Sequence, residues 1–258
     1  MPLAQGIHYT LHSQKDALSR RPPLILIHGA GGSFLSWHPY QRRLTGETVY
    51  TLDLPGHASS EGESRQFVGE YAANVAGFME NLAIESAVIV GHSMGSGIAL
   101  TLALEYPHKV RALALMGGGA KLRVAPFILT LAGSPETFSE AVERINRACF
   151  SSHTSDELLG LSKKNMLNTR PSVLHNDLLA CDRFDVMTRL ANIHVPALIL
   201  CGTEDEMTPP RSSQYLKDNL PNAQLHFLEA TGHMLMLEQP EAVVKLMKQF
   251  LDEIPPLS

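Results

Sequence analysis

The sequence is poor in cysteine and in charge. Its 258 residues include three cysteines, Cys149, Cys181 and Cys201, and no CxxC pair. An odd number of widely spaced cysteines argues against a disulfide framework and against a zinc site, so we expect reduced, buried thiols. Charged residues make up 18% of the chain, and the net charge is −5 without a basic stripe. This composition argues against a nucleic-acid partner.

Long apolar runs are also missing. The continuous apolar stretches are only a few residues long, whereas a helix needs about 20 residues to span a bilayer. Charged residues interrupt the N-terminal region, so no targeting segment is apparent. We therefore expect no integral membrane segment and a cytoplasmic location, with the chain present as a monomer or a homodimer.

Short apolar runs alternate with longer amphipathic stretches. The amphipathic stretches predict helices at 68–82, 94–106, 211–219 and 240–254. The apolar runs predict strands at 24–27, 49–52, 87–90, 112–116, 197–201 and 224–228, and a weaker strand at 7–12 that is expected to form an antiparallel edge. Several of these strands are apolar on both faces. Such strands alternating with helices indicate an α/β fold, with a mostly parallel sheet flanked by helices.

Residues 118–190 break this alternation. Their pattern is helical, with predicted helices at 135–149, 155–168 and 171–181, and strand character returns only at Pro196. We interpret this stretch as a helical cap (lid) inserted between two strands, with residues 1–117 and 191–258 forming the core. Ordinary α/β packing with one missed strand is the alternative.

A serine lies in the sequence Gly-His-Ser-Met-Gly at residues 91–95, between a predicted buried strand and a predicted helix. The G-x-S-x-G pattern in this context is typical of a nucleophile elbow, a sharp turn that exposes the serine above the sheet. Gly91 and Gly95 leave free the space that side chains would fill. We therefore predict that Ser93 is a nucleophile; a chance Gly/Ser turn is the alternative.

A serine hydroxyl becomes a good nucleophile only when a base takes its proton. In chain order, an acid and then a histidine should follow the serine. Asp205 comes just after the predicted strand at 197–201, and His233 comes just after the last predicted strand. Both therefore fall at the carboxyl edge of the sheet, where open α/β sheets bind ligands. Asp182 and Asp185 are weaker candidates for the acid.

A glycine-rich loop, His-Gly-Ala-Gly-Gly-Ser, occupies residues 28–33 directly after a predicted strand. Acyl transfer needs N–H donors aimed at the developing oxyanion, and we predict the backbone N–H groups of Ala30 and Met94. The loop matches neither GxGxxG nor GxxxxGK[ST], which argues against phosphate binding. We assign His28, His57 and His92 to hydrogen bonds that shape loops.

Taken together, these segments resemble the α/β-hydrolase superfamily over essentially the full chain. The matching stretches are the loop at 28–33, Asp-Leu-Pro-Gly-His at 53–57, the elbow at Ser93, the acid loop at Asp205 and Gly-His at 232–233. The chain is most similar to capped esterases, acylglycerol-type lipases and carbon–carbon bond hydrolases. This resemblance implies an eight-stranded, mostly parallel sheet with a lid after the sixth strand, and a structural role for Asp53. Epoxide hydrolases and haloalkane dehalogenases of the superfamily carry Asp at the elbow, so Ser93 argues for acyl transfer.

These features predict a serine hydrolase that cleaves small to medium carboxylic esters through an acyl-enzyme intermediate, with no metal or cofactor. One alternative is a carbon–carbon bond hydrolase or an acyltransferase that uses the same three residues. The other is a ligand sensor on a hydrolase scaffold. Candidate substrate contacts, which could equally pack inside the protein, are Phe34, Trp37, Phe127, Leu129, Met166 and Met187.

Overall fold

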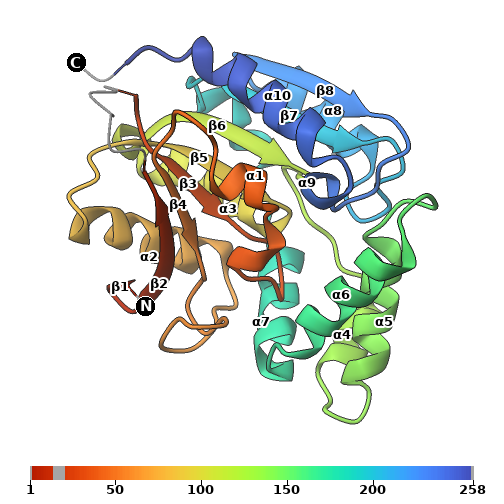
Figure 1. Ribbon diagram of the computed structural model, residues 1–258. Helices are drawn as coiled ribbons and strands as arrows, with labels where there is room; N and C mark the ends of the chain where they lie inside the picture. Colours follow the sequence, from red (N-terminus) through yellow and green to blue (C-terminus); the bar gives the residue numbers. More distant parts are fainter. Residues whose placement is uncertain (1, 14–20, 257–258) are drawn as a thin grey trace.

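The computed structural model describes residues 2–13 and 21–256 (Figure 1). Eight strands form one sheet in the order β1-β2-β4-β3-β5-β6-β7-β8. The strands are β1 (Leu3–Ala4), β2 (Ile7–His12), β3 (Leu24–Ile27), β4 (Val49–Leu52), β5 (Ala87–His92), β6 (Val110–Met116), β7 (Ala197–Gly202) and β8 (Ala223–Leu228). β2 runs antiparallel to β1 and β4, and all neighbours from β4 to β8 are parallel. The predicted eight-stranded, mostly parallel sheet is confirmed.

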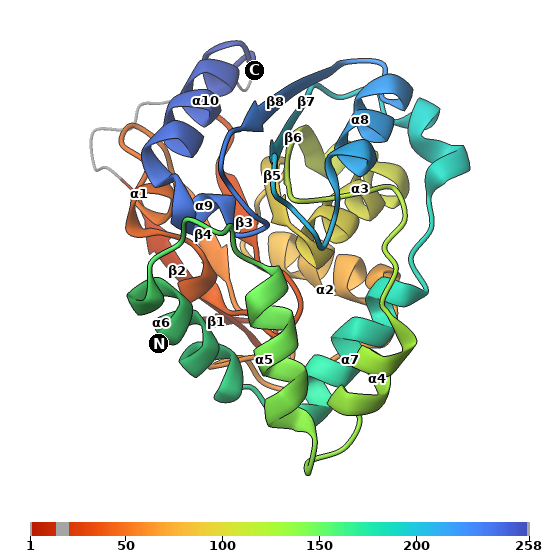
Figure 2. The same cartoon turned by 90° about the vertical axis from the view of Figure 1, so that its right-hand side faces the viewer.

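Helices cover both faces of the sheet (Figure 2). One face carries α2 (Val68–Asn81), α3 (Met94–Glu105) and α8 (Pro210–Asn219), and the other carries α1 (Pro39–Arg42), α9 (Leu235–Glu238) and α10 (Pro240–Asp252). Three short 3-10 helices are η1 (Phe34–Ser36), η2 (Pro107–Lys109) and η3 (Met187–Asn192). None of the described helices is long and apolar enough to cross a bilayer.

Alternate residues of each central strand feed two separate apolar layers. In β3, Ile25 and Ile27 pack into the layer under α2 and α3, whereas Leu24 and Leu26 pack into the layer under α10. All four side chains are fully buried. Continuous apolar runs are therefore required, because side chains alternate between the two faces of a strand and both faces are covered.

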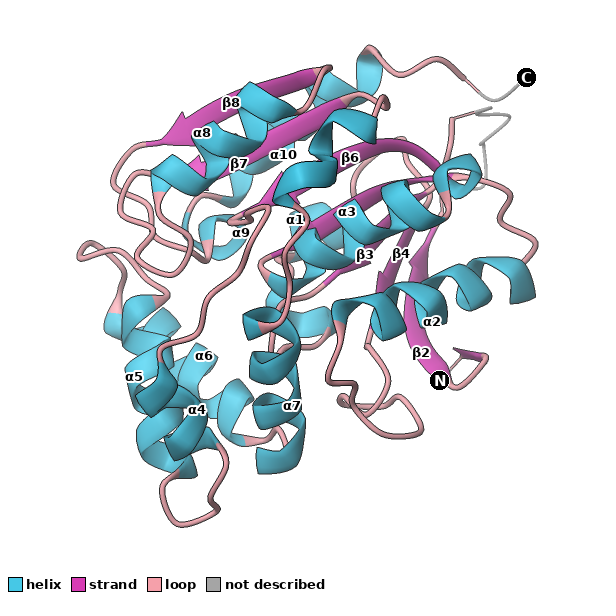
Figure 3. Cartoon of the chain, turned by 180° about the vertical axis from the view of Figure 1, so that it is seen from behind, coloured by secondary structure: helices cyan, strands magenta, loops and turns pink. Residues whose placement is uncertain are grey.

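Four further helices lie between β6 and β7 in sequence, and we call them the cap helices. They are α4 (Pro126–Ala132), α5 (Phe138–Ala148), α6 (Asp156–Leu167) and α7 (Pro171–Asp182). They gather beyond the carboxyl ends of the strands and share an apolar cluster of their own (Figure 3). A β-bridge and an ion pair between Lys121 and Asp185 bring together the two ends of this segment.

The pattern alone did not indicate α4, because Pro126 reads as a break in a helix. In the structure Pro126 is the first residue of α4, and Pro171, Pro210 and Pro240 likewise begin α7, α8 and α10. A proline is tolerated there because the first N–H groups of a helix have no partner within the helix.

Candidate active site

Ser93 lies on a strained turn between β5 and α3. Its backbone has φ 54° and ψ −118°, a conformation that non-glycine residues rarely adopt. A Cβ on Gly91 would come within 2.2 Å of the Gly95 carbonyl oxygen, and a Cβ on Gly95 would come equally close to the Ile27 carbonyl oxygen. Both positions therefore admit only glycine, which accounts for the spacing of the elbow. A strained backbone that the surrounding structure holds in place, like that of Ser93, is typical of a functional site.

His233 and Asp205 form a buried pair. The His233 Nδ1 atom lies 2.9 Å from the Asp205 Oδ2 atom, and the two residues are 2% and 3% exposed. The backbone N–H groups of Met207 and Thr208 donate to Asp205 Oδ1, and the Thr208 hydroxyl donates to Oδ2. Burial alone would raise the pKa of Asp205, but the His233 ring and the Thr208 hydrogen bonds lower it overall. Asp205 is therefore held as a carboxylate that can orient the imidazole.

A glycine makes room for this pair. Gly117, at the end of β6, has φ +53°, and a Cβ there would lie 2.9 Å from His233 Nδ1. Asp182 and Asp185 lie elsewhere: Asp182 accepts the Val124 N–H, and Asp185 pairs with Lys121. The structure thus brings Asp205, rather than either weaker candidate, to His233.

The loop of residues 29–33 carries the predicted donor Ala30, and for that prediction we call it the oxyanion loop. It lies against Ser93. A Cβ on Gly29 would come within 2.9 Å of the Ser93 Cβ atom. Within the described residues, the N–H groups of Ala30 and Met94 donate no hydrogen bond, whereas the Gly31 N–H donates to Asp177. The two amides predicted as oxyanion donors are therefore both uncommitted.

A cavity of about 390 Å³ opens between the oxyanion loop and the cap helices. Ser93, His92 and His233 line one side, and Ile145, Met166, Leu174 and Leu178 line the other. Among the described residues of the lining, Arg170 is the one Lys or Arg; its side chain is 53% exposed and lies 3.6 Å from Glu63. The cap side also contributes polar residues, namely Ser162, Asn165, Asn168 and Thr169. A concave cavity that combines apolar side chains with polar groups is typical of a small-molecule site.

The comparison with known proteins agrees with the fold. Residues 22–240 match the sequence profile described as the alpha/beta hydrolase fold. The chain belongs to the α/β-hydrolase family. Among curated relatives, this hydrolase is 30% identical over 252 residues to a 2-hydroxy-6-oxo-6-phenylhexa-2,4-dienoate hydrolase of Burkholderia cepacia, covering 88% of this chain and 87% of the relative. It is 29% identical to a 2-hydroxy-6-oxononadienedioate/2-hydroxy-6-oxononatrienedioate hydrolase of Burkholderia vietnamiensis, covering 95% of this chain and 90% of the relative.

Solved structures also resemble this α/β hydrolase. A thermophilic esterase superposes with a TM-score of 0.81 at 29% identity, over 96% of this chain and 98% of the esterase. The enol-lactonase of Burkholderia xenovorans superposes with a TM-score of 0.87 at 22% identity, over 96% of each chain, a likeness that concerns the fold. The relatives thus include enzymes named for dienoate hydrolysis and others named for ester or lactone chemistry.

Of the six residues predicted to contact substrate, the structure places only Met166 in the cavity lining. Trp37 is 1% exposed and packs in the apolar layer under α10, and Phe34 packs edge-on against His8. The reason is the Ser33–Ser36 capping box, which turns the chain into η1 directly after the oxyanion loop. The other three lie in the cap region: Phe127 is 54% exposed beside Arg144, Leu129 packs among the cap helices, and Met187 packs against the layer under α2 and α3.

Three buried histidines shape the loops of this α/β hydrolase, as predicted. His28 Nε2 accepts the Leu54 N–H, His57 Nε2 lies 2.7 Å from Asp177, and His92 Nε2 lies 3.0 Å from the His233 carbonyl oxygen. Asp53, also predicted to be structural, is fully buried and accepts the Phe34 N–H. These four residues thus bond to other groups of the protein, as structural residues do.

Acid should destabilise the protein through two of these histidines. Burial, reinforced by His57, lowers the pKa of His28 to about 4, and burial, reinforced by His233, lowers the pKa of His92 to about 3. Because the unfolded chain binds these protons near pH 6.5, stability is fully present above that pH and is lost as the pH falls towards 4. Each histidine should contribute about 1.4 kcal/mol per pH unit. Urea unfolding at half-unit steps from pH 6.5 to 4.5 measures this slope.

His92→Gln provides the internal comparison for that slope. Glutamine keeps a donor for the His233 carbonyl but does not titrate, so the slope should fall by about one proton. His57 does not offset the effect, because its pKa is raised above 6.5 and its contribution is constant below that pH. An unchanged slope in the variant would contradict the role of His92.

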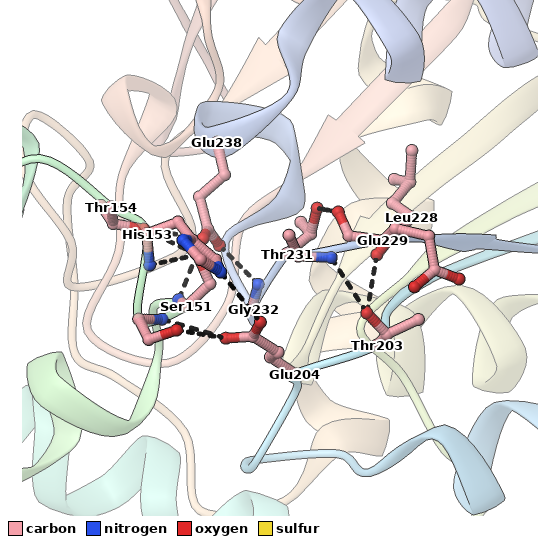
Figure 4. A network of polar contacts seen from close by, with 12 residues as sticks. Ser151, His153, Thr154, Thr203, Glu204, Leu228, Glu229, Thr231, Gly232 and Glu238 are labelled. Atoms are coloured by element: carbon pink, nitrogen blue, oxygen red, sulfur yellow. Dashed lines mark hydrogen bonds and ion pairs between the residues drawn. The ribbon is translucent and has the colours of Figure 1, made fainter.

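The linker between α5 and α6 is tied to the loops that carry Asp205 and His233 (Figure 4). The Glu238 carboxylate accepts hydrogen bonds from the Ser151 N–H, the Thr154 hydroxyl and the Gly232 N–H. Glu204, beside Asp205, accepts from both the N–H and the hydroxyl of Ser152. In addition, the His233 N–H donates to the Cys149 carbonyl at 2.9 Å. The cap linker and the His233 loop therefore form one hydrogen-bonded unit.

Sequence reasoning missed Glu238, Thr208 and Asp177, which no motif marks. For Asp177 a signal was present. It lies on α7 three or four residues from Val173, Leu174, Ala180 and Cys181, all buried. A carboxylate within an apolar helix face must be paired when the helix packs, so its position indicates buried hydrogen-bond partners.

Proposed function

We propose that this α/β hydrolase is a serine hydrolase that cleaves carboxylic esters of small to medium acyl chain. Ser93 acts as nucleophile, His233 as general base and Asp205 as the acid that orients His233. The observation that carries the proposal is that a strained elbow serine and the histidine of a buried Asp–His pair line the same cavity.

The proposed cycle has two halves. Ser93 attacks the ester carbonyl while His233 accepts the hydroxyl proton, and the amides of Ala30 and Met94 stabilise the oxyanion of the tetrahedral intermediate. The intermediate collapses, the alcohol leaves with the proton from His233, and the acyl group remains on Ser93. Water then attacks this ester with His233 again as base, which frees the acid and restores the serine.

The cavity supports neutral acyl groups over strongly anionic ones. Its cap side presents the apolar Met166, Leu174 and Leu178 and the uncharged Ser162, Asn165, Asn168 and Thr169. Among the described lining residues the one guanidinium, that of Arg170, is half exposed and already opposed by Glu63. A buried carboxylate on the substrate would need a desolvated cationic partner. A neutral ester with an aliphatic chain needs no such partner. The proposed oxyanion donors would bind its carbonyl oxygen, and the apolar side chains would contact its acyl chain.

A second candidate is hydrolysis of a vinylogous 2-hydroxy-6-oxo-dienoate by the same three residues. The names of the Burkholderia relatives favour it, at 29–30% identity over most of both chains. Steady-state kinetics separate the two proposals: p-nitrophenyl acetate to decanoate form one series, and a 2-hydroxy-6-oxohexa-2,4-dienoate the other. We expect ester turnover with an optimum at short to medium chain length. Turnover of the dienoate without ester cleavage would replace the first proposal by the second.

Met166→Ala should move the chain-length optimum. Met166 lines the cavity from α6, so its truncation lengthens the acyl pocket. Discrimination in apolar pockets is worth about 10-fold or more per methylene, and the ratio of kcat/KM for octanoate to that for acetate should rise by roughly 10-fold. Met187→Ala is the matched control, since Met187 packs outside the cavity. An equal shift in both variants would show that Met166 does not set the chain length.

A further inference from the structure

A fully buried carboxylate that the proposed cycle does not use contacts the oxyanion loop. Asp177, on cap helix α7, is 0% exposed. It accepts hydrogen bonds from the Gly31 N–H at 2.8 Å, from His57 Nε2 at 2.7 Å and from the Tyr71 hydroxyl. A buried charge persists only when it is paired and hydrogen-bonded. These donors come from three separate segments of the core, so Asp177 joins the cap to all three.

The same loop residue is held on its other side. The Thr169 hydroxyl, between α6 and α7, donates to the Gly31 carbonyl at 2.9 Å. Gly31 has φ +64°, and a Cβ there would lie 2.8 Å from Leu174 Cδ1 on α7. Both polar groups of Gly31 are thus bonded to the cap segment, and its backbone packs against that segment without space for a side chain.

Two amides of the oxyanion loop are committed to hydrogen bonds within the protein. The Gly31 N–H donates to Asp177, and the Gly32 N–H donates to the Gly29 carbonyl. The Ala30 N–H donates to no described residue, and Gly29 next to it lies against Ser93. A loop released from the cap could rotate its peptides, because three of its five residues are glycine.

We propose that Asp177 and Thr169 are positioning residues that hold the oxyanion loop from the cap side, so that the Ala30 amide stays directed at the reacting carbonyl. This inference rests on the proposed acyl-transfer function. The cap is then part of the catalytic machinery rather than only a cover, because it fixes one of the two oxyanion donors. Its effect falls on the transition state and not on substrate affinity.

Asp177→Asn tests this role. Asparagine keeps the shape but removes the negative charge and one acceptor oxygen. Its NH2 group either faces the Gly31 N–H and His57, where a bond must break, or faces the Tyr71 hydroxyl, which must then turn and accept. In both cases the hold on Gly31 is weakened. We expect kcat for the best p-nitrophenyl ester to fall by about 10- to 100-fold with KM within about threefold, since a displaced oxyanion donor costs up to about 10²–10³. The affinity for a trifluoromethyl ketone, which forms the oxyanion, should fall by the same factor as kcat/KM.

Asp182→Asn is the matched control, because Asp182 lies on the same helix and accepts one backbone N–H, from Val124, away from the loop. Its kcat should stay within twofold of wild type. Thr169→Val, which removes only the bond to the Gly31 carbonyl, serves if Asp177→Asn does not fold; its kcat should fall about 3- to 10-fold. A folded Asp177→Asn or Thr169→Val protein with unchanged kcat and ketone affinity would overturn the proposal.

Amide hydrogen exchange of residues 29–33 gives a reading that does not depend on the substrate. Exchange there should be faster in Thr169→Val and Asp177→Asn than in Asp182→Asn, whatever bond the enzyme cleaves. A wild-type protein that cleaves no ester would contradict the proposed function, and the exchange result would then decide the positioning role by itself. Equal exchange in all three variants would overturn it.

Discussion

Ser93→Ala should lower ester hydrolysis by about 10⁴-fold or more, which corresponds to about 5.5 kcal/mol of activation free energy. The substitution removes the hydroxyl that is proposed to attack the carbonyl and leaves the elbow glycines, the His233–Asp205 pair and the cavity in place. Alanine must adopt the same φ of 54° as Ser93, so stability should change little. Initial rates with the best p-nitrophenyl ester measure the loss, and thermal unfolding monitors the fold.

Covalent labelling provides the control for this result. A fluorophosphonate should react once per chain with the wild-type protein and not with Ser93→Ala. Substrate affinity should survive in the variant, since the cavity walls are untouched. A folded Ser93→Ala protein that keeps most of its activity would exclude Ser93 as the nucleophile and with it the acyl-enzyme.

Asp205→Asn should lower kcat by about 10³- to 10⁴-fold with little change in KM. Asparagine can turn its NH2 group towards His233 Nδ1, which favours the tautomer with the proton on Nε2, and Nε2 then cannot accept the proton of the serine. The NH2 group should take the place of Oδ2, because the N–H groups of Met207 and Thr208 need an acceptor at the position of Oδ1. The rate of acyl-enzyme formation in stopped-flow burst experiments measures the effect.

Glu206→Gln is the matched control for Asp205→Asn. Glu206 is the next residue in the chain and is exposed, so the same change of charge should leave kcat within twofold. Equal losses in both variants would show that the effect comes from net charge near the cavity and not from orientation of His233. A small loss in both would show that another group orients the imidazole.

The elements of the site that could be predicted are those with a local chemical reason. The elbow needs glycine at 91 and 95 because any Cβ there would collide with backbone. The acid and histidine follow strands whose apolar runs are evident, so their place at the carboxyl edge follows from the parallel topology. The sheet and its covering helices were predicted for the same reason: buried strands and amphipathic helices have distinct periods.

The elements that could not be predicted depend on contacts between distant segments. Phe34 and Trp37 follow the oxyanion loop in sequence, but η1 turns them away from the cavity. Likewise, Asp177 is 146 residues from Gly31. No periodicity indicates which apolar side chain of a helix faces a cavity and which faces its neighbour, since both positions are buried and apolar.

The two attachments of the cap restrict how new specificities arise in this scaffold. Exchanging the whole segment between β6 and β7 with that of a relative would remove Asp177 and the Ser151–Thr154 linker together, and so disturb the oxyanion loop and the His233 loop. Residues Ser162, Asn165 and Met166 on α6 line the cavity but belong to neither attachment. Substitutions at these three positions should change the shape of the cavity without disturbing the oxyanion loop or the His233 loop. A library of variants confined to these positions should therefore yield new substrate preferences with activity retained.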